Sequence, residues 1–256
     1  MHSFTLLNTR PAHQATELND LVVESGGKVI SCPTIEVEWR ALLVTDVKKV
    51  GDFDKLIFTS ANAIEGWVRW FNQQNNQSEL SGLTCYAIGK ATKIKGLELG
   101  LNIVTLSDTQ FDSEHFLAHP TMHEVKGLAI GLVKGIGGRT LIENTLTERG
   151  AVVSQLNVYQ RKTIPFCKQA WQCFIASPNP ILLITSIESW QNLLKGLSDE
   201  LNDSVAVIDS VNQVYGFVVM SQRIADEVLK LGCSTAIKVV TTQSNQGIVK
   251  TIQQYV

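Results

Sequence analysis

The sequence lacks the features that would place it in several common classes of protein. Its 22 basic residues do not outnumber its 24 acidic ones, so it has no excess of positive charge with which to neutralise a phosphate backbone. Its apolar stretches, such as Pro180–Ile184, are far shorter than the roughly 20 residues needed to cross a bilayer. We therefore expect neither nucleic acid nor a membrane as a partner.

Cysteine is scarce and irregularly placed. The 5 cysteines are odd in number and never spaced as C-x-x-C, which argues against both a disulfide framework and a zinc ribbon. The chain also passes from Met1 directly into a strand-like segment, without the basic start and apolar core of a secretory signal. We therefore expect a cytoplasmic protein with buried thiols.

Motifs for metal, nucleotide or covalent chemistry are missing as well. A glycine-rich stretch, residues 134–140, has the composition of an anion-binding turn before a helix, but it fits neither nucleotide fingerprint. A carboxylate-binding turn and a purely structural loop both stay open. Three histidines between His115 and His123 have Pro120 among them, which breaks a helix, and no G-x-S-x-G elbow is present. We expect no metal site, no nucleotide site and no covalent catalysis.

The chain repeats its own organisation at offsets of about 124 to 132 residues. Residues 6–26 and 130–150 each predict a strand, a turn and an amphipathic helix that ends in E-x-G. Two further strand and helix units follow in each half, and the last ends at Gly100 or Gly232. The growing offset predicts a loop insertion of about six residues between Asp203 and Gly216, where added length costs little.

Strands and helices alternate throughout, which predicts the α/β fold class. Strands such as residues 55–58 are almost continuously apolar, as in parallel strands that are buried on both faces. Two extended segments, residues 28–40 and 152–165, occupy equivalent places in the two copies and are rich in Val, Ile and Thr. We interpret them as paired connectors between two domains.

Polar residues follow the predicted strands, at the edge where open α/β sheets bind ligands. These turns would supply two similar rims of backbone amides, one in each domain. Purely structural roles for these residues are the alternative to ligand binding. Ser60 and Ser186 are natural helix caps, and Arg10 is equally compatible with a solvated surface charge.

Five short motifs in this order resemble the uroporphyrinogen-III synthase family, and together they extend over nearly the whole chain. They are L-x-T-R-P at residues 7–11, F-T-S-A-N-A-I-E at 58–65, A-I-G-K-A-T at 87–92, L-x-E-R-G-A-x-V at 146–153 and N-V-Y-Q-R-K at 157–162. Each motif is weak alone. Their order and spacing carry the resemblance.

The resemblance implies two flavodoxin-like parallel-sheet domains joined by a two-stranded β connector. The first domain would comprise residues 1–36 plus 166–256, and the second, residues 41–152, would be inserted into it. The resemblance also implies a lyase that needs no cofactor and closes the linear tetrapyrrole hydroxymethylbilane to uroporphyrinogen III. Water is lost and the last pyrrole ring is inverted in this reaction. We expect a monomer whose domains close around this substrate.

Roles for individual residues follow from the same resemblance. Tyr159 would donate a proton or a hydrogen bond to the departing hydroxyl, although a packing role between the domains is its alternative. The turn Ser221-Gln222-Arg223 departs from the Gly-Pro-Thr-Thr-like turn of many relatives. The residues expected to bind the carboxylates of the substrate are Thr9, Arg10, Ser60, Ala61, Asn62, Gly89, Lys90, Thr92, Gly138, Arg139, Ser186 and Ser221.

A non-enzymatic, two-lobed protein that binds a small molecule is the alternative from another class, because duplicated α/β lobes also serve that purpose. A nucleotide-dependent transferase would need the phosphate fingerprint that the sequence lacks.

Overall fold

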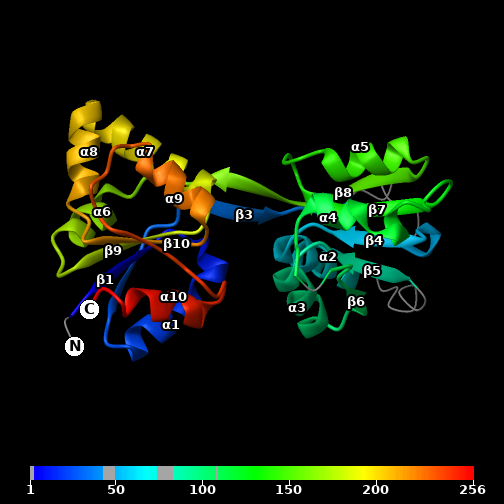
Figure 1. Ribbon diagram of the computed structural model, residues 1–256, viewed down its shortest axis with the longest axis horizontal. Coiled ribbons are helices and arrows are strands. Elements are labelled where there is room, and N and C mark those ends of the chain that lie inside the picture. Colours follow the sequence, from blue (N-terminus) through cyan, green and yellow to red (C-terminus); the bar gives the residue numbers. More distant parts are fainter. Residues whose placement is uncertain (1–2, 43–49, 74–82, 108) are drawn as a thin grey trace. The chain divides into compact units, whose positions relative to one another are not determined.

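The computed structural model describes residues 3–42, 50–73, 83–107 and 109–256. The chain divides into two compact units (Figure 1). Unit 1 comprises Met1–Glu36 and Lys162–Val256, and unit 2 comprises Val37–Arg161. Each unit is built on a sheet of mainly parallel strands with helices on both faces, so the α/β fold class is confirmed.

Unit 1 contains a five-stranded sheet in the order β11-β10-β9-β1-β2. Taken in chain order, these strands have the 2-1-3-4-5 arrangement of flavodoxin-like folds. Its strands are β1 (Thr5–Asn8), β2 (Lys28–Ser31), β9 (Pro180–Ile184), β10 (Gly216–Val219) and β11 (Ile237–Val239). Its helices are α1 (Thr16–Glu24), α6 (Lys168–Ile175), α7 (Ile187–Leu201), α8 (Ser204–Asn212), α9 (Gln222–Leu229) and α10 (Asn245–Ile252), with a 3-10 turn at Ala12–Gln14.

Both faces of this sheet are covered, which explains its apolar strands. Leu6 and Leu183 pack on the side of α1 and α10, whereas Leu7 and Leu182 pack beneath α6 to α9. Successive side chains of a strand point to opposite faces, so a strand between two helical layers must be apolar at every position. This requirement accounts for runs such as residues 180–184.

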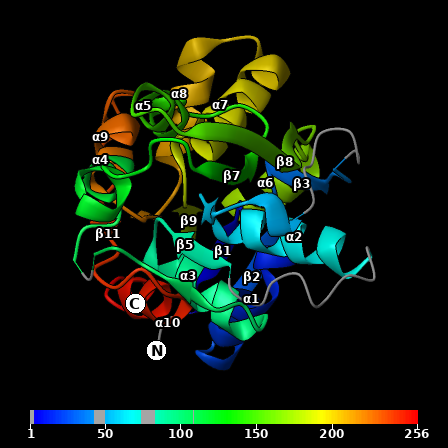
Figure 2. The same ribbon diagram turned by 90° about the vertical axis from the view of Figure 1, so that its right-hand side faces the viewer.

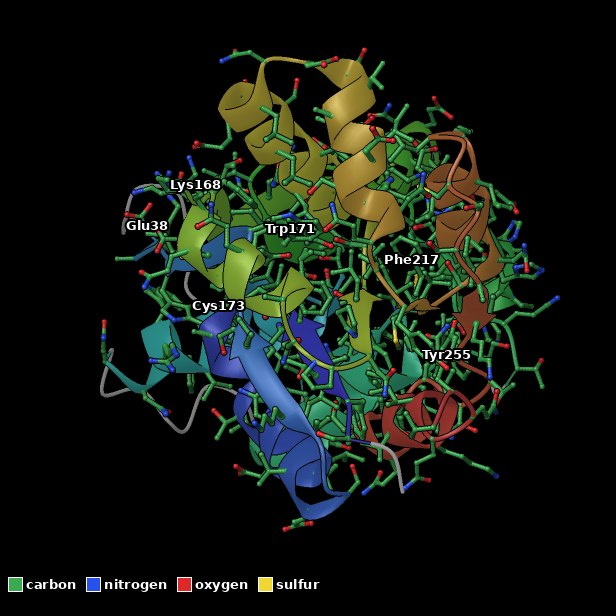
Figure 3. All side chains as sticks on the ribbon, turned by 90° about the vertical axis from the view of Figure 1, so that its left-hand side faces the viewer. Glu38, Lys168, Trp171, Cys173, Phe217 and Tyr255 are labelled. Carbon is green, nitrogen blue, oxygen red and sulfur yellow. The ribbon has the colours of Figure 1, made fainter. Side chains whose placement is uncertain are left out.

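The end of the chain is fixed to this sheet by one aromatic residue, Tyr255, which is labelled with Phe217 in Figure 3. A Cβ at Gly216 would lie 2.5 Å from the Tyr255 ring, so the ring can pack there only against glycine. The Tyr255 hydroxyl lies 2.8 and 2.9 Å from the carbonyl oxygens of Phe217 and Ala236. Burial raises the pKa of Tyr255 to about 12, so it donates to these carbonyls at any ordinary pH.

Unit 2 contains a six-stranded sheet in the order β3-β8-β7-β4-β5-β6. Its strands are β3 (Ile35–Trp39), β4 (Lys55–Phe58), β5 (Thr84–Ala87), β6 (Ile103–Val104), β7 (Ala129–Gly135) and β8 (Val152–Thr163). Its helices are α2 (Ala61–Asn72), α3 (Lys90–Glu98), α4 (Ser113–Ala118) and α5 (Leu141–Glu148), with 3-10 turns at Val50–Asp52 and Pro120–Met122. Helices α2 and α3 cover one face and α4 and α5 the other (Figures 1 and 2).

The two sequence copies do not coincide with the two structural units. The first copy supplies β1 and β2 to unit 1 but β4 to β6 to unit 2, and the second copy divides in the complementary way. If β3 is left aside, the strands β8, β7, β4, β5 and β6 of unit 2 correspond in order to β2, β1, β9, β10 and β11 of unit 1. The two units therefore share one strand order and are related by a circular permutation. Each sheet combines two strands of one copy with three of the other. The domain limits given above stay a prediction.

Two expectations about connecting segments were wrong in part. Lys28–Ser31 is not a connector but strand β2, paired in parallel with β1. The first part of residues 152–165 likewise belongs to a sheet strand, because β8 pairs with β7 up to Tyr159. The predicted two-stranded connector itself is confirmed: β3 and β8 are neighbours, and the division between the units falls within both strands. Val and Ile in alternation suit a sheet strand as well as a linker, so composition alone does not separate the two.

The insertion near Asp203 is a helix, α8, and not a longer loop. The Asp203 carboxylate caps it by accepting the Val205 amide, and Val207 and Val211, one helical turn apart, are buried in the core. The corresponding part of the first copy, residues 74–82, lies outside the described residues. Within the part of the chain that the structure describes, no helix is long and apolar enough to cross a membrane.

Candidate functional site

A hollow of about 320 Å³ lies at the carboxyl ends of strands β4 and β7 in unit 2. We call it the β7 hollow. It is lined by the ends of these strands, the glycine-rich turn after β7, the start of α4, and Tyr159 and Arg161 of β8. The strand order reverses between β4 and β7, and doubly wound sheets bind ligands at such a switch point.

Tyr159 forms one wall of the β7 hollow and is held there on three sides. Its ring lies over Gly135, where a Cβ would come within 2.5 Å of the tyrosine Cζ. The ring of Trp39 meets it edge-on at a centroid distance of 6.4 Å. Its hydroxyl lies 3.1 Å from the Ser60 Oγ, and only 3% of the residue is exposed. The phenol therefore has a fixed position.

Ser60 has two roles at the same place. Its Oγ accepts the Ala63 amide at 3.1 Å and so caps α2, which confirms the predicted capping role. The same oxygen is the partner of the Tyr159 hydroxyl. Because the amide fixes the Ser60 side chain, the serine in turn fixes the direction of the phenol.

Basic side chains outnumber acidic ones in the lining of the β7 hollow. Lys134, Arg139 and Arg161 face a single acidic lining residue, Asp112. Hydrogen bonds from His115 lower the pKa of Asp112, which stays ionised and caps α4. Arg139 binds Glu114 and lowers its pKa in the same way. The arrangement suits an anionic ligand.

The glycine-rich turn between β7 and α5 supplies backbone as well as charge. Gly137 and Gly138 both have φ of +79°, which side chains rarely tolerate. The backbone of this turn lines the β7 hollow and leads to Arg139. A group of three or more His, Cys, Asp and Glu residues that could hold a metal is absent from the described ranges.

The equivalent switch point of unit 1 lies between β1 and β9. Thr9 is buried there and donates to the Leu183 carbonyl at 2.9 Å. Arg10 donates to the Asn245 side chain at 2.7 Å, and burial lowers the pKa of its guanidinium. Arg10 is therefore a held, partly buried cation and not a freely solvated charge. Ser186 caps α7 in a capping box with Ser189.

The family model described as "Uroporphyrinogen-III synthase HemD" matches residues 16–245. The chain belongs to the uroporphyrinogen-III synthase family. Its predicted membership is therefore confirmed, and with it the assignment to the lyases.

Relatives of this family resemble the chain in sequence and in fold. The uroporphyrinogen-III synthase of Escherichia coli K12 is 26% identical over 97% of this chain and 100% of that protein. That of Proteus mirabilis is 27% identical over 64% of this chain and 84% of that protein. The solved uroporphyrinogen-III synthetase of Helicobacter pylori has a TM-score of 0.64 at 14% identity and covers both chains completely. A mutant uroporphyrinogen III synthase of Thermus thermophilus has a TM-score of 0.63 at 15% identity, over 100% of this chain and 98% of that chain.

The structure brings some of the predicted site residues of this family member together and leaves others apart. Those that line the β7 hollow are Ser60, Gly138, Arg139 and Tyr159. Those that lie on the same edge of unit 2 without lining it are Ala61, Asn62, Gly89, Lys90 and Thr92. Those in unit 1 are Thr9, Arg10, Ser186 and Ser221, the last of which caps α9.

Three charged residues that line the β7 hollow were not among the predicted ones. Arg161 follows Tyr159 by two positions, and the period of a strand would have placed it on the same side. Asp112 precedes a helix as a typical cap. Lys134 interrupts an otherwise apolar strand, Ala129–Gly135, which is an unusual place for a charge.

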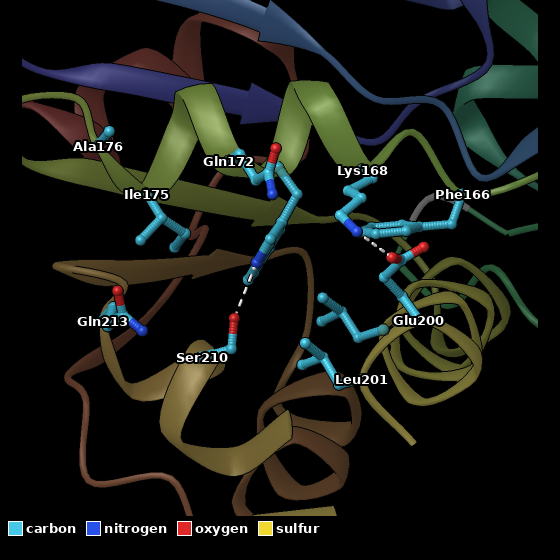
Figure 4. Close-up of a pocket in the computed structure, with 11 residues that line it drawn as sticks. Phe166, Lys168, Gln172, Ile175, Ala176, Glu200, Leu201, Ser210 and Gln213 are labelled. Atoms are coloured by element: carbon cyan, nitrogen blue, oxygen red, sulfur yellow. Dashed lines mark hydrogen bonds and ion pairs between the residues drawn. The ribbon is translucent and has the colours of Figure 1, made fainter. Parts of the chain in front are cut away.

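Unit 1 contains another cavity, of about 390 Å³, within its layer of helices α6, α7 and α8 (Figure 4). Trp171 donates to Ser210 at 2.9 Å across it, and Lys168 pairs with Glu200 at its rim. The cavity lies against the carboxyl end of α7, at Leu197 to Leu201. Because α7 starts at the ligand-binding edge of the sheet, its end lies away from that edge. No predicted site residue lines this cavity.

Proposed function

We propose that this chain closes hydroxymethylbilane to uroporphyrinogen III, with loss of water and inversion of the last pyrrole ring. The observation that carries the proposal is the Tyr159 hydroxyl, held 3.1 Å from Ser60 in the wall of a basic hollow. This hollow offers one proton donor together with groups that bind carboxylates. Both are what a polycarboxylate substrate with a leaving hydroxyl requires.

The chemistry needs no strong nucleophile from the protein. Electron-rich pyrroles expel a neighbouring hydroxyl themselves, so the enzyme has to assist its departure and hold the chain in a productive fold. Tyr159 gives its proton to the departing oxygen, the C–O bond breaks and water leaves. Ser60 then donates a hydrogen bond from its hydroxyl to the phenol oxygen, and this bond stabilises the negative charge that develops on that oxygen. Ring closure releases a proton that restores Tyr159.

The acetate and propionate groups of the substrate bind to the strand-to-helix turns of both units. Ser60, Gly138 and Arg139 take carboxylates at the β7 hollow, with backbone amides beside them. Ala61, Asn62, Gly89, Lys90, Thr92, Thr9, Arg10, Ser186 and Ser221 extend these two rims. The side chains of Thr9 and Thr92 are buried, so these two residues contribute through their backbone.

The proposal includes a monomeric protein that acts in the cytoplasm. Its two domains, residues 1–36 plus 166–256 and 41–152, close around the flexible bilane and exclude water from it.

Binding and turnover together separate this proposal from a protein that only binds a small molecule. We expect uroporphyrin III to raise the melting temperature, whereas ATP and NAD leave it unchanged. We also expect the chain to consume hydroxymethylbilane faster than the uncatalysed closure, over many turnovers for each protein molecule. A melting shift with uroporphyrin III and no acceleration would favour the binding protein. A shift with ATP or NAD alone would contradict the proposal and favour a nucleotide-dependent protein.

A further inference from the structure

Lys134 is a largely buried lysine whose ammonium opens to the β7 hollow. It lies in β7, where the sequence Ala-Ile-Gly-Leu-Val-Lys-Gly is apolar except for this residue. Only 6% of Lys134 is exposed, yet it lines the β7 hollow. Neither a hydrogen bond nor an ion pair joins its ammonium to any residue that the structure describes.

The stem of the Lys134 side chain is enclosed, whereas its ammonium stays open to the β7 hollow. Lysine often buries its methylene stem in this way while its charged head stays in water. Methionine has a similar length and flexibility without the charge, and would satisfy the same apolar surroundings. An ammonium that opens into a hollow and pairs with no described residue is suited to bind an anion that enters there.

Asp112, the one acidic residue among the described residues that line the β7 hollow, does not pair with Lys134. Its carboxylate is engaged by the backbone and ring of His115, and Glu114 beside it is bound to Arg139. The ammonium of Lys134 can therefore take an anion from a molecule that enters the hollow. A carboxylate fits, since an ammonium binds it through charge-assisted hydrogen bonds.

Alternation along β7 places Lys134 and Tyr159 on opposite sides of this strand. Ile130 and Leu132, on the face that Lys134 shares, pack against α4 and α5. Tyr159 lies over Gly135 and packs with residues on the α2 side. Both side chains reach the β7 hollow beyond the end of the strand. Lys134 and Tyr159 would thus contact a bound substrate from two directions, Lys134 at a carboxylate and Tyr159 at the leaving group.

We propose that Lys134 binds one carboxylate of the substrate and thereby fixes the position of the bilane relative to Tyr159. The inference rests on the proposed function, which supplies a substrate with many carboxylates, and it assigns one of them to a particular side chain. Lys134 takes no part in the proton transfer. Its contribution is to binding and alignment.

The test compares Lys134→Met and Lys134→Arg with the wild type in steady-state kinetics on hydroxymethylbilane. We expect Lys134→Met to raise KM by about 10- to 100-fold, the effect of one charged hydrogen bond, with kcat changed much less. Lys134→Arg restores the charge and most of the affinity. Lys126→Met is the matched control, because Lys126 is an exposed lysine that precedes the same strand at its other end. It should leave KM unchanged.

Measurements without turnover separate this inference from the proposed function. The affinity for uroporphyrin III, from quenching of tryptophan fluorescence, should fall at least about tenfold in Lys134→Met. The melting temperature of the ligand-free Lys134→Met variant should stay within about 2 °C of the wild type, because the ammonium pairs with no residue that the structure describes. A structural lysine would lower the melting temperature when it is replaced.

Each outcome bears on one claim or the other. Unchanged KM and unchanged affinity in Lys134→Met overturn the inference and leave the proposed function standing. Weaker binding together with a lower melting temperature also overturns it, because Lys134 would then act through the fold. A wild type that binds uroporphyrin III through Lys134 but does not consume the bilane overturns the proposed function alone.

Discussion

Tyr159→Phe is expected to lower kcat about 100-fold or more, within the range that general acid catalysis contributes. The substitution removes the oxygen that lies 3.1 Å from Ser60 and keeps the ring that packs over Gly135. Its cost in stability is one hydrogen bond, about 1 kcal/mol. A large loss of turnover with an almost unchanged fold is therefore the signature of a proton donor.

Tyr86→Phe is the matched control for this measurement. Tyr86 is also a buried tyrosine of unit 2, and its hydroxyl is 3.4 Å from the Lys55 Nζ, but it does not line the β7 hollow. The two variants should differ in kcat, measured from steady-state rates, and agree in stability, measured by thermal unfolding. If Tyr159→Phe turned over the bilane at the wild-type rate, Tyr159 would have no part in the mechanism.

Gly135→Ala is expected to damage both the stability of unit 2 and its activity. The added methyl group would lie 2.5 Å from the Tyr159 Cζ, so the ring must move. Crowding of this kind costs about 1–3 kcal/mol. A displaced ring carries its hydroxyl away from Ser60, and a shift of about 1 Å can lower the rate of a positioned reaction 100-fold.

A double mutant identifies the cause of this damage. In Gly135→Ala/Tyr159→Ala the ring that clashes is gone, so the free energy of unfolding should exceed the value expected from adding the two single effects. Gly51→Ala is the control, because a Cβ there meets nothing within 4 Å, and it should change stability by less than about 0.5 kcal/mol. Additive effects of Gly135→Ala and Tyr159→Ala would contradict the contact. The free energy of unfolding is measured in urea for the four variants and the wild type.

The elements of the fold could be predicted from the sequence because they depend on local patterns. The apolar stripe of α7 and the buried run of β9 are visible within a few residues. The exchange of strands between the copies is not, because it rests on pairs such as β1 with β9 and β4 with β7, which lie far apart in the chain. Helix α8 was missed because its sequence, Ser-Val-Ala-Val-Ile-Asp-Ser-Val-Asn, is rich in β-branched residues, which favour strands over helices.

The candidate site could be predicted in part for a similar reason. Ser60, Arg139 and Tyr159 stand in recognisable motifs and line one hollow. The burial of Lys134 follows only when α4 and α5 cover its face of the sheet. The role of Gly135 becomes visible only when the Tyr159 ring is in place above it.

The identity of the porphyrin isomer formed from hydroxymethylbilane tests the central claim most directly. The purified chain is mixed with freshly generated bilane, the products are oxidised and the uroporphyrin isomers are separated, with heat-inactivated protein as the control. We expect isomer III to predominate with the active protein and isomer I with the control. Isomer I alone in both samples would contradict the proposed function.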